Sequence, residues 1–97
     1  MSHLIRIVKM EFWPETVDTF LELFAERRTK IRQFEGCTHL DLWRDQTNPH
    51  LFFTHSHWTN AAALEAYRHS PLFKATWALT KPLFAAPAQA WSVRETD

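Results

Sequence analysis

His55 and His57 are the residues whose type and spacing most directly suggest chemistry. They lie in the segment HLFFTHSHW at 50–58, where Phe, Thr and Trp favour a β-strand, so both imidazoles point to one face. This spacing suits a metal site, but the sequence does not place a carboxylate or a third histidine next to the pair as a further ligand. We therefore expect no metal. A histidine acting as a general base is the preferred interpretation, because its pKa lies near neutral pH.

Cys37 and His39 have the same spacing in the segment CTHLDLWR at 37–44. One interpretation is a nucleophile and its base. A partly buried cysteine beside a turn accounts for the pair equally well, so we assign it no catalytic role.

A third group of candidates is aromatic and comprises Trp58, Tyr67, Phe73 and Trp77. These side chains could form the walls of a pocket for a flat aromatic ligand, with Tyr67 as the polar group. They could equally be core residues, since Phe73 and Trp77 are four residues apart, as on one face of a helix.

The composition excludes several classes of protein. Eleven Lys and Arg residues balance eleven Asp and Glu residues, so we expect neither nucleic acid nor a membrane as a partner. Cys37 is the only cysteine, which excludes an internal disulfide, and Gly36 is the only glycine, which excludes glycine-rich phosphate loops. The N-terminal run MSHLIRIVKM carries charges and is typical of neither a signal peptide nor a membrane span. We expect a cytoplasmic protein with one domain, residues 1–97.

Hydrophobic periodicity predicts the elements that position these residues. Strands are expected at 3–13, 37–44, 50–58 and 88–95, with an amphipathic helix from about 16 to 34 that ends at Gly36. A second helix is expected from 59–60, interrupted at Pro71 and continuing to about 79. The order β-α-β-β-α-β is that of the ferredoxin-like α+β fold, whose antiparallel four-stranded sheet carries both helices on one face.

The other face of such a sheet has no helix to cover it. The strand at 50–58 has bulky side chains on both faces, from Leu51 to His57 on one and from Phe52 to Trp58 on the other. Neither set is polar enough for water, and the C-terminal tail RETD is too short to cover it. A second copy of the sheet is the expected cover, which predicts a homodimer.

Three segments occur in an order and spacing typical of one known family. They are the first helix followed by EGC at 35–37, the aromatic strand ending in Trp58, and the segment ALEAYRHSPLFKA at 63–75. The chain thereby resembles the antibiotic biosynthesis monooxygenase superfamily over nearly its whole length. The resemblance implies a dimeric α+β barrel. It extends to cofactor-free quinol or anthrone monooxygenases, haem-degrading enzymes, isomerases and members without known activity.

The chain departs from the motifs of several members of the family, and these departures reduce the number of activities that it can share with them. In the haem-degrading members the first strand has an Asn, the second helix a Trp, and a haem-ligating His follows ten residues later. Residues 3–13 contain no Asn, Tyr67 stands in place of the Trp, and Trp77 replaces the ligand His, so we expect no haem. Many quinol-oxidising and isomerase members have a His after the Pro of the helix break, where this chain has Leu72.

Two functional hypotheses follow from the resemblance and the candidate residues. The first is a monooxygenase without a cofactor that acts on a small phenol, quinol or anthrone-like molecule. In it His55 or His57 is the base, Tyr67 donates a hydrogen bond to the anion, and Trp58, Phe73 and Trp77 bind the substrate. The alternative is a non-catalytic metabolite-binding or isomerase-type member of the same superfamily.

Overall fold

The computed structural model describes residues 3–96, which form one sheet and a layer of helices. The elements are β1 (Leu4–Glu11), η1 (Pro14–Thr16), α1 (Val17–Arg32), β2 (Cys37–Arg44), β3 (Leu51–Trp58), α2 (Ala61–Arg68), α3 (Pro71–Thr80), η2 (Lys81–Leu83) and β4 (Gln89–Val93). The predicted order is confirmed, with the second helix divided into α2 and α3 at Pro71.

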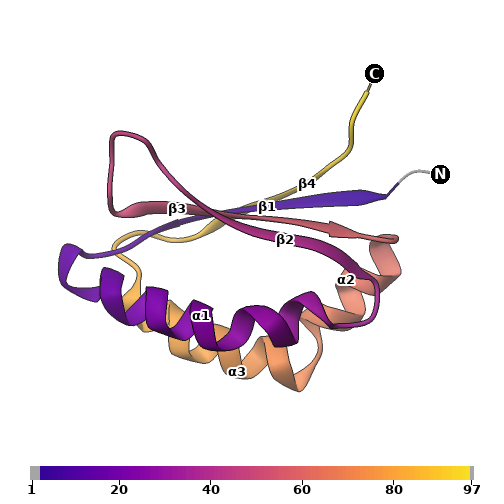
Figure 1. Cartoon of the computed structure of the whole chain (residues 1–97), viewed down its shortest axis with the longest axis horizontal. Helices are drawn as coiled ribbons and strands as arrows, with labels where there is room; N and C mark the ends of the chain where they lie inside the picture. The colour runs from indigo at the N-terminus through magenta and orange to yellow at the C-terminus, as the bar shows by residue number, and fades with distance from the viewer. Residues whose placement is uncertain (1–2, 97) are drawn as a thin grey trace.

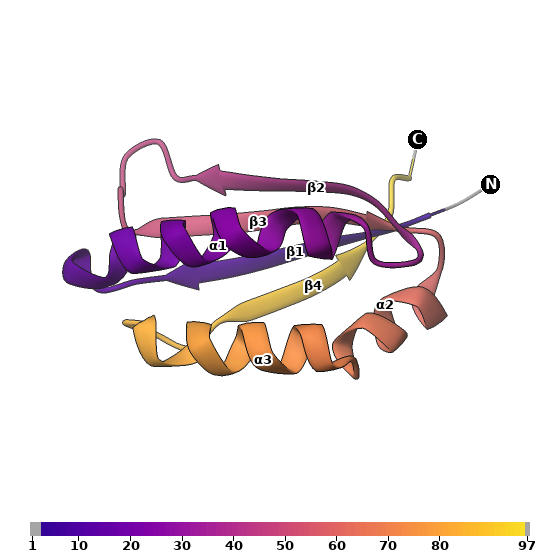
Figure 2. The ribbon, with the colours of Figure 1, turned by 60° about the horizontal axis from the view of Figure 1, so that its bottom comes forward.

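The sheet has the strand order β2-β3-β1-β4, and each neighbouring pair is antiparallel. Helices α1, α2 and α3 all lie on one side of it, as Figure 1 shows from the edge and Figure 2 from the helix side. This arrangement confirms the ferredoxin-like α+β fold predicted from the sequence.

The core lies between the sheet and the helices. Alternate strand residues face the helices, among them Met10 on β1 and Phe52 on β3, both almost fully buried. Helix α1 meets them with Val17, Phe20, Phe24 and Ile31, the apolar face that its periodicity predicts. A second, smaller core cluster is formed by Cys37, Trp58 and Leu64.

Local sequence signals fix where α2 and α3 begin. The Asn60 side-chain oxygen accepts a hydrogen bond from the Ala63 N–H (2.8 Å), and the Ser70 hydroxyl accepts one from the Phe73 N–H (3.1 Å). Gly36, just before β2, has a φ of +92°, and a Cβ atom at this position would lie 2.4 Å from Cβ of Ala63. Glycine is therefore required both by the backbone and by the close approach of α2.

The face of the sheet opposite the helices, which we call the open face, carries one of the two side-chain sets that the sequence left as alternatives. It is the set with Phe53, His55 and His57, since Phe52 and Trp58 are buried under the helices. Trp43, Trp91 and Val93 of the outer strands, all on the open face, are 46%, 44% and 45% exposed. Within residues 3–96, no helix has both the length and the apolar character needed to cross a membrane.

Candidate functional site

A cavity of about 110 Å³ lies between the sheet and the helices. Strands β1 and β3 form its floor, and α1, α2 and α3 form its walls. Most of its lining is apolar, with a few hydroxyl groups. The lining residues are Val8, Met10, Phe20, Phe24, Ile31, Thr54, Tyr67, Phe73, Thr76, Trp77 and Thr80. Three of the four aromatic residues selected from the sequence, Tyr67, Phe73 and Trp77, are thus brought together in one wall.

Tyr67 is held in this wall by aromatic packing. Its ring stacks on Trp58 (4.9 Å between centroids) and meets the edges of Phe34 (5.4 Å) and Phe73 (5.2 Å). Trp58 itself is 1% exposed, donates its indole N–H to the Ser56 hydroxyl (3.0 Å), and is absent from the cavity lining. Trp58 is therefore a core residue that positions Tyr67, and the expectation that it contacts a ligand directly has no support from this geometry.

The polar groups of the cavity are hydroxyls. Thr76 accepts a hydrogen bond from Arg27 (3.3 Å), and the Thr80 hydroxyl donates one to the Thr76 carbonyl (2.7 Å). The hydroxyls of Thr54 and Tyr67 have no hydrogen-bond partner among residues 3–96. Burial, with a further contribution from Cys37, raises the pKa of Tyr67, so its phenol stays protonated and acts as a donor.

His55 and His57 lie on the open face, across the sheet from the cavity. Their neighbour Thr54 lines the cavity, and successive strand residues point to opposite faces. The prediction that these histidines and Tyr67 form one site is wrong, because side chains alternate between the two faces along β3. Neither imidazole can remove a proton from a molecule bound against Tyr67.

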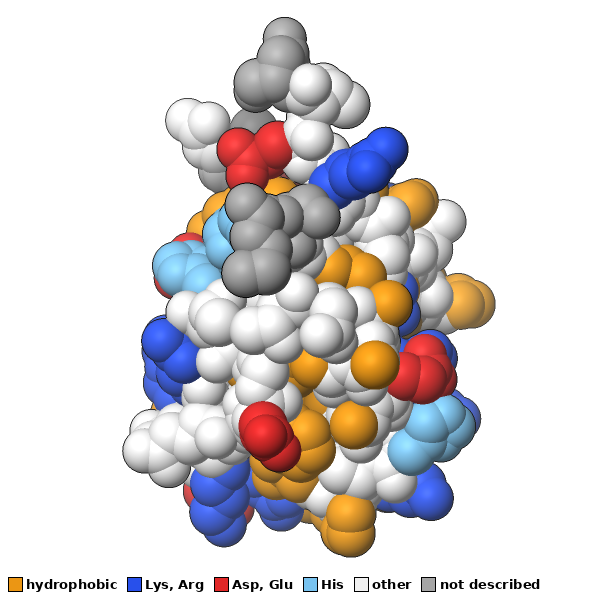
Figure 3. Space-filling model, turned by 90° about the vertical axis from the view of Figure 1, so that its right-hand side faces the viewer, with side chains coloured by type: hydrophobic (Ala, Val, Ile, Leu, Met, Phe, Trp, Pro, Cys, Tyr) orange, Lys and Arg blue, Asp and Glu red, His pale blue; other side chains and the backbone are white. Residues whose placement is uncertain are grey.

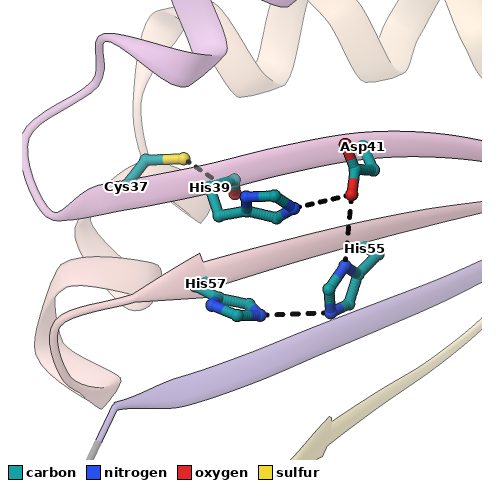
Figure 4. Close-up of polar contacts among 5 residues, drawn as sticks. All are labelled: Cys37, His39, Asp41, His55 and His57. Carbon is teal, nitrogen blue, oxygen red and sulfur yellow. Dashed lines mark hydrogen bonds and ion pairs between the residues drawn. The ribbon is translucent and has the colours of Figure 1, made fainter.

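On the open face the two histidines join a polar group that we call the histidine cluster: His39, Asp41, His55 and His57 (Figure 4). The antiparallel register of β2 and β3 pairs His39 with His57 and Asp41 with His55. Nε2 of His39 lies 2.6 Å from Oδ2 of Asp41, and Nδ1 of His55 lies 3.7 Å from the same oxygen. The two Nε2 atoms of His55 and His57 are 3.1 Å apart. Sequence reasoning missed His39 and Asp41 as neighbours of this pair, although their alternation along β2 placed both on one face.

Two members of the cluster, Asp41 and His57, have shifted pKa values. A hydrogen bond from His39 is the main cause that lowers the pKa of Asp41, so the carboxylate is ionised at neutral pH. Burial lowers the pKa of His57, and the neighbouring His55, His3 and His39 lower it further. The His57 ring is therefore neutral at pH 7 and able to accept a hydrogen bond.

Cys37 and His39 do not form a nucleophile and base. The Cys37 thiol is buried in the smaller core cluster and donates to the backbone carbonyl of His39 (3.6 Å), while the His39 ring contacts Asp41 on the open face. A β-bulge between the two residues separates their side chains. Burial also raises the pKa of the thiol, which disfavours the reactive thiolate.

A second hollow of about 420 Å³ lies at the end of the molecule where β1 and α2 begin. It is wide open to solvent, and its lining includes His3, Asn60 and Arg94. Figure 3 views this end of the molecule, where hydrophobic side chains are interspersed with charged ones. Because it is more open and less apolar than the cavity under the sheet, this hollow is a weaker candidate for a catalytic site.

The fold and the cavity define a ferredoxin-like α+β protein with a mostly apolar site between its sheet and its helices. The chain belongs to the antibiotic biosynthesis monooxygenase family, because the model of that family matches residues 4–79. No curated protein matches the chain.

Several solved structures share the whole fold. A structure described as antibiotic biosynthesis monooxygenase is 26% identical with a TM-score of 0.90, and the match covers 97% of this chain and 99% of that one. A conserved protein from Methanosarcina mazei Go1 is 22% identical with a TM-score of 0.90, covering 97% and 94% of the two chains. A conserved protein of unknown function from Bacteroides thetaiotaomicron VPI-5482 is 19% identical with a TM-score of 0.86, covering 97% and 98%. The last two matches concern the fold alone.

Proposed function

We propose that the chain is a monooxygenase that needs no cofactor and oxygenates a small phenol or quinol in the cavity under the sheet. The observation that carries this proposal is a half-open, mostly apolar cavity, in a member of this family, with two hydroxyls, those of Thr54 and Tyr67, that have no hydrogen-bond partner among residues 3–96. Apolar walls exclude water, and the hydroxyls are the groups available to orient an oxygen-bearing ring.

The size of the cavity favours a substrate with one ring. An apolar cavity of about 150 Å³ holds benzene, and the cavity here measures about 110 Å³. A three-ring anthrone would require α3 to move away from the sheet, since Phe73 and Trp77 of α3 form one wall. We therefore favour monocyclic phenols and dihydroquinones over anthrones.

The proposed reaction needs no external reductant. The phenolate gives an electron to O2, and recombination of the two radicals forms a bond between the O2 unit and a hydrogen-bearing ring carbon, para to the oxygen in a simple phenol and ortho to it in a dihydroquinone. Loss of water from this hydroperoxide leaves a quinone. One oxygen atom of O2 is thus bonded to the ring, and the other leaves as water with the two hydrogens that the phenol loses. The Tyr67 hydroxyl would stabilise the phenolate oxygen by donating a hydrogen bond.

The lining of the cavity constrains how the phenol loses its proton. Among the described residues no histidine and no carboxylate lines the cavity, and the Tyr67 phenol stays protonated. The proton must therefore leave to solvent before the substrate is enclosed. For a given phenol, the rate should rise with pH along the pKa of the substrate.

A homodimer is the assembly that suits the open face. This face carries Phe53, Trp43 and Trp91 without a covering helix, and such a surface is typical of an interface. Light scattering after size exclusion should give twice the 11.5 kDa mass of the chain. A monomer at micromolar concentration would contradict a dimer formed through this face.

The second candidate function is binding without catalysis. The lack of a proton acceptor in the described cavity lining favours this alternative, and it argues against an isomerase that moves protons in the same cavity. A binding protein would hold the same monocyclic phenols, and they would raise its melting temperature without consumption of O2.

Oxygen uptake with a panel of monocyclic phenols and dihydroquinones tests the proposal. Isotopically labelled O2 should leave one labelled atom in the product, and Tyr67→Phe should lower kcat/KM about a hundredfold. His57→Ala should keep the rate, because His57 lies across the sheet. If His57→Ala lowers kcat/KM a hundredfold while Tyr67→Phe keeps full activity, a histidine is the general base and the proposed site is wrong. A rise in melting temperature without oxygen uptake would favour the binding function.

A further inference from the structure

The geometry points to a second site, a transition-metal site of the zinc class formed by His39, Asp41 and His55 on the open face. These residues offer two imidazole nitrogens and one carboxylate oxygen, which all lie within 4.8 Å of one another. Spacing along the sequence indicates only the pair His55 and His57. The register of the hairpin adds the carboxylate of Asp41 and the imidazole of His39. This site is separate from the cavity and does not rest on the proposed oxygenase function.

Two of the three distances between the ligand atoms need little change to hold an ion, and the third, between His39 and His55, is within 4.8 Å. Ligand atoms at about 2.0–2.2 Å from zinc in a tetrahedron are about 3.3 Å apart. Nδ1 of His55 and Oδ2 of Asp41 are 3.7 Å apart, which is close to that value. Nε2 of His39 and Oδ2 of Asp41 are 2.6 Å apart and would have to separate by less than about 1 Å, within reach of a side-chain rotation.

One nitrogen of the cluster is unsatisfied within the described chain. Nδ1 of His55 is buried and has no hydrogen-bond partner among residues 3–96, and Oδ2 of Asp41 lies just beyond hydrogen-bond distance. Buried polar atoms are normally paired, so this nitrogen calls for an explanation. A cation bound between the nitrogen and the carboxylate would satisfy both.

The surroundings hold His55 in the orientation that a ligand requires. Nε2 of His55 lies 3.1 Å from Nε2 of His57, so we assign the proton to Nε2 of His55, which leaves the lone pair on Nδ1 free. Metal-binding histidines usually donate their other ring N–H in this way. Trp43 stacks on the His55 ring, at 4.5 Å between centroids, and further restricts its rotation.

The donor set selects the class of ion. Two imidazoles and one carboxylate suit Zn²⁺ and its neighbours Co²⁺ and Ni²⁺, whereas Mg²⁺ and Ca²⁺ prefer oxygen ligands alone. Three protein ligands leave one tetrahedral position for water.

Metal titration of the full, untagged chain after treatment with a chelator tests this inference. One Zn²⁺ per chain should bind, and Co²⁺ should give the intense visible bands of a four-coordinate ion. Asp41→Asn and His55→Gln should each weaken Zn²⁺ binding at least about a hundredfold, since each removes a direct ligand. His57→Ala should weaken it by about 10–100-fold, as expected for the loss of an outer hydrogen-bond partner.

His69→Gln is the matched control. His69 also lies beside a carboxylate, at 2.9 Å from Glu65, but directly after α2 and outside the histidine cluster. This variant should bind Zn²⁺ like the wild type. Circular dichroism should show that each variant is folded. If His55→Gln does not fold, the affinity of Asp41→Asn for Zn²⁺ tests the site, because this substitution keeps the shape of the side chain. Equal affinity in wild type, Asp41→Asn and His57→Ala, or a pale six-coordinate Co²⁺ spectrum, would overturn the proposed site.

Discussion

Replacement of Gly36 by alanine tests how tightly α2 is fixed against the start of β2. The added methyl group would lie 2.4 Å from Cβ of Ala63 and 3.2 Å from the Thr59 hydroxyl, and the backbone there has a φ of +92°. The Thr59 N–H also donates to the Gly36 carbonyl (2.9 Å), so the chain cannot move away without the loss of that bond. This substitution therefore combines backbone strain with a steric clash.

The two effects have separate magnitudes. A left-handed conformation costs a residue with a Cβ about 1–2 kcal/mol. Forcing a methyl group into a packed contact costs about 1–3 kcal/mol more. We expect Gly36→Ala to lower the free energy of unfolding by about 2–5 kcal/mol, which for a chain of this size lowers the melting temperature by about 10 °C or more.

A double-mutant cycle with Ala63→Gly separates strain from clash. Ala63→Gly alone should cost about 1 kcal/mol, because glycine weakens a helix. In that background Gly36→Ala no longer meets a Cβ atom and should cost mainly the backbone strain and the smaller contact with Thr59, which gives a coupling of about 1–3 kcal/mol. Urea unfolding of the four proteins measures these values. If Gly36→Ala costs the same in both backgrounds, the close approach of α2 does not explain the glycine.

Three further predictions concern the cavity, a turn and the thiol. Trp77→Ala should open the cavity and let two-ring phenols bind, as measured by calorimetry, while the wild type rejects them. The Asp45 carboxylate accepts bonds from the Asn48 and Thr47 N–H groups and the Thr47 hydroxyl, and these bonds lower its pKa. Its stabilisation is therefore present above the unfolded pKa and lost as pH falls through the folded pKa, so Asp45→Asn should flatten the acid side of the stability profile. Cys37, whose pKa is raised by burial, should react with a thiol reagent at pH 8 at least about tenfold more slowly in the folded chain than in urea.

The fold was predictable because the elements follow simple periodicities. The spacing of Val17, Phe20, Phe24 and Ile31 predicted α1, and Pro71 marked the break between α2 and α3. The choice of open face was not predictable from β3, which is bulky on both sides. It depends on which set packs against α1, and this is decided by tertiary contacts.

The site was predictable only in part. Tyr67, Phe73 and Trp77 were selected from the sequence and do line one cavity, but its volume depends on packing that a linear pattern does not contain. The grouping of His57 with Tyr67 failed because of the alternation along β3. Trp58, which stacks on Tyr67, follows His57 directly and must therefore point to the opposite face.

The histidine cluster depends on a detail that spacing does not reveal. The β-bulge between Cys37 and His39 sets the register that brings Asp41 opposite His55. The homodimer and the lack of haem binding remain predictions.

The claim that the small molecule binds under the sheet, away from the open face, can be tested on a single strand. Alternate residues of β1 report on the two faces: Val8 and Met10 line the cavity, whereas Ile5 and Ile7 lie on the open face. Methyl NMR spectra during titration with an acidic monocyclic phenol measure both faces at once. We expect the Val8 and Met10 methyl signals to shift with saturation while those of Ile5 and Ile7 stay in place. Shifts confined to Ile5 and Ile7 would place the ligand on the open face and contradict the proposed site.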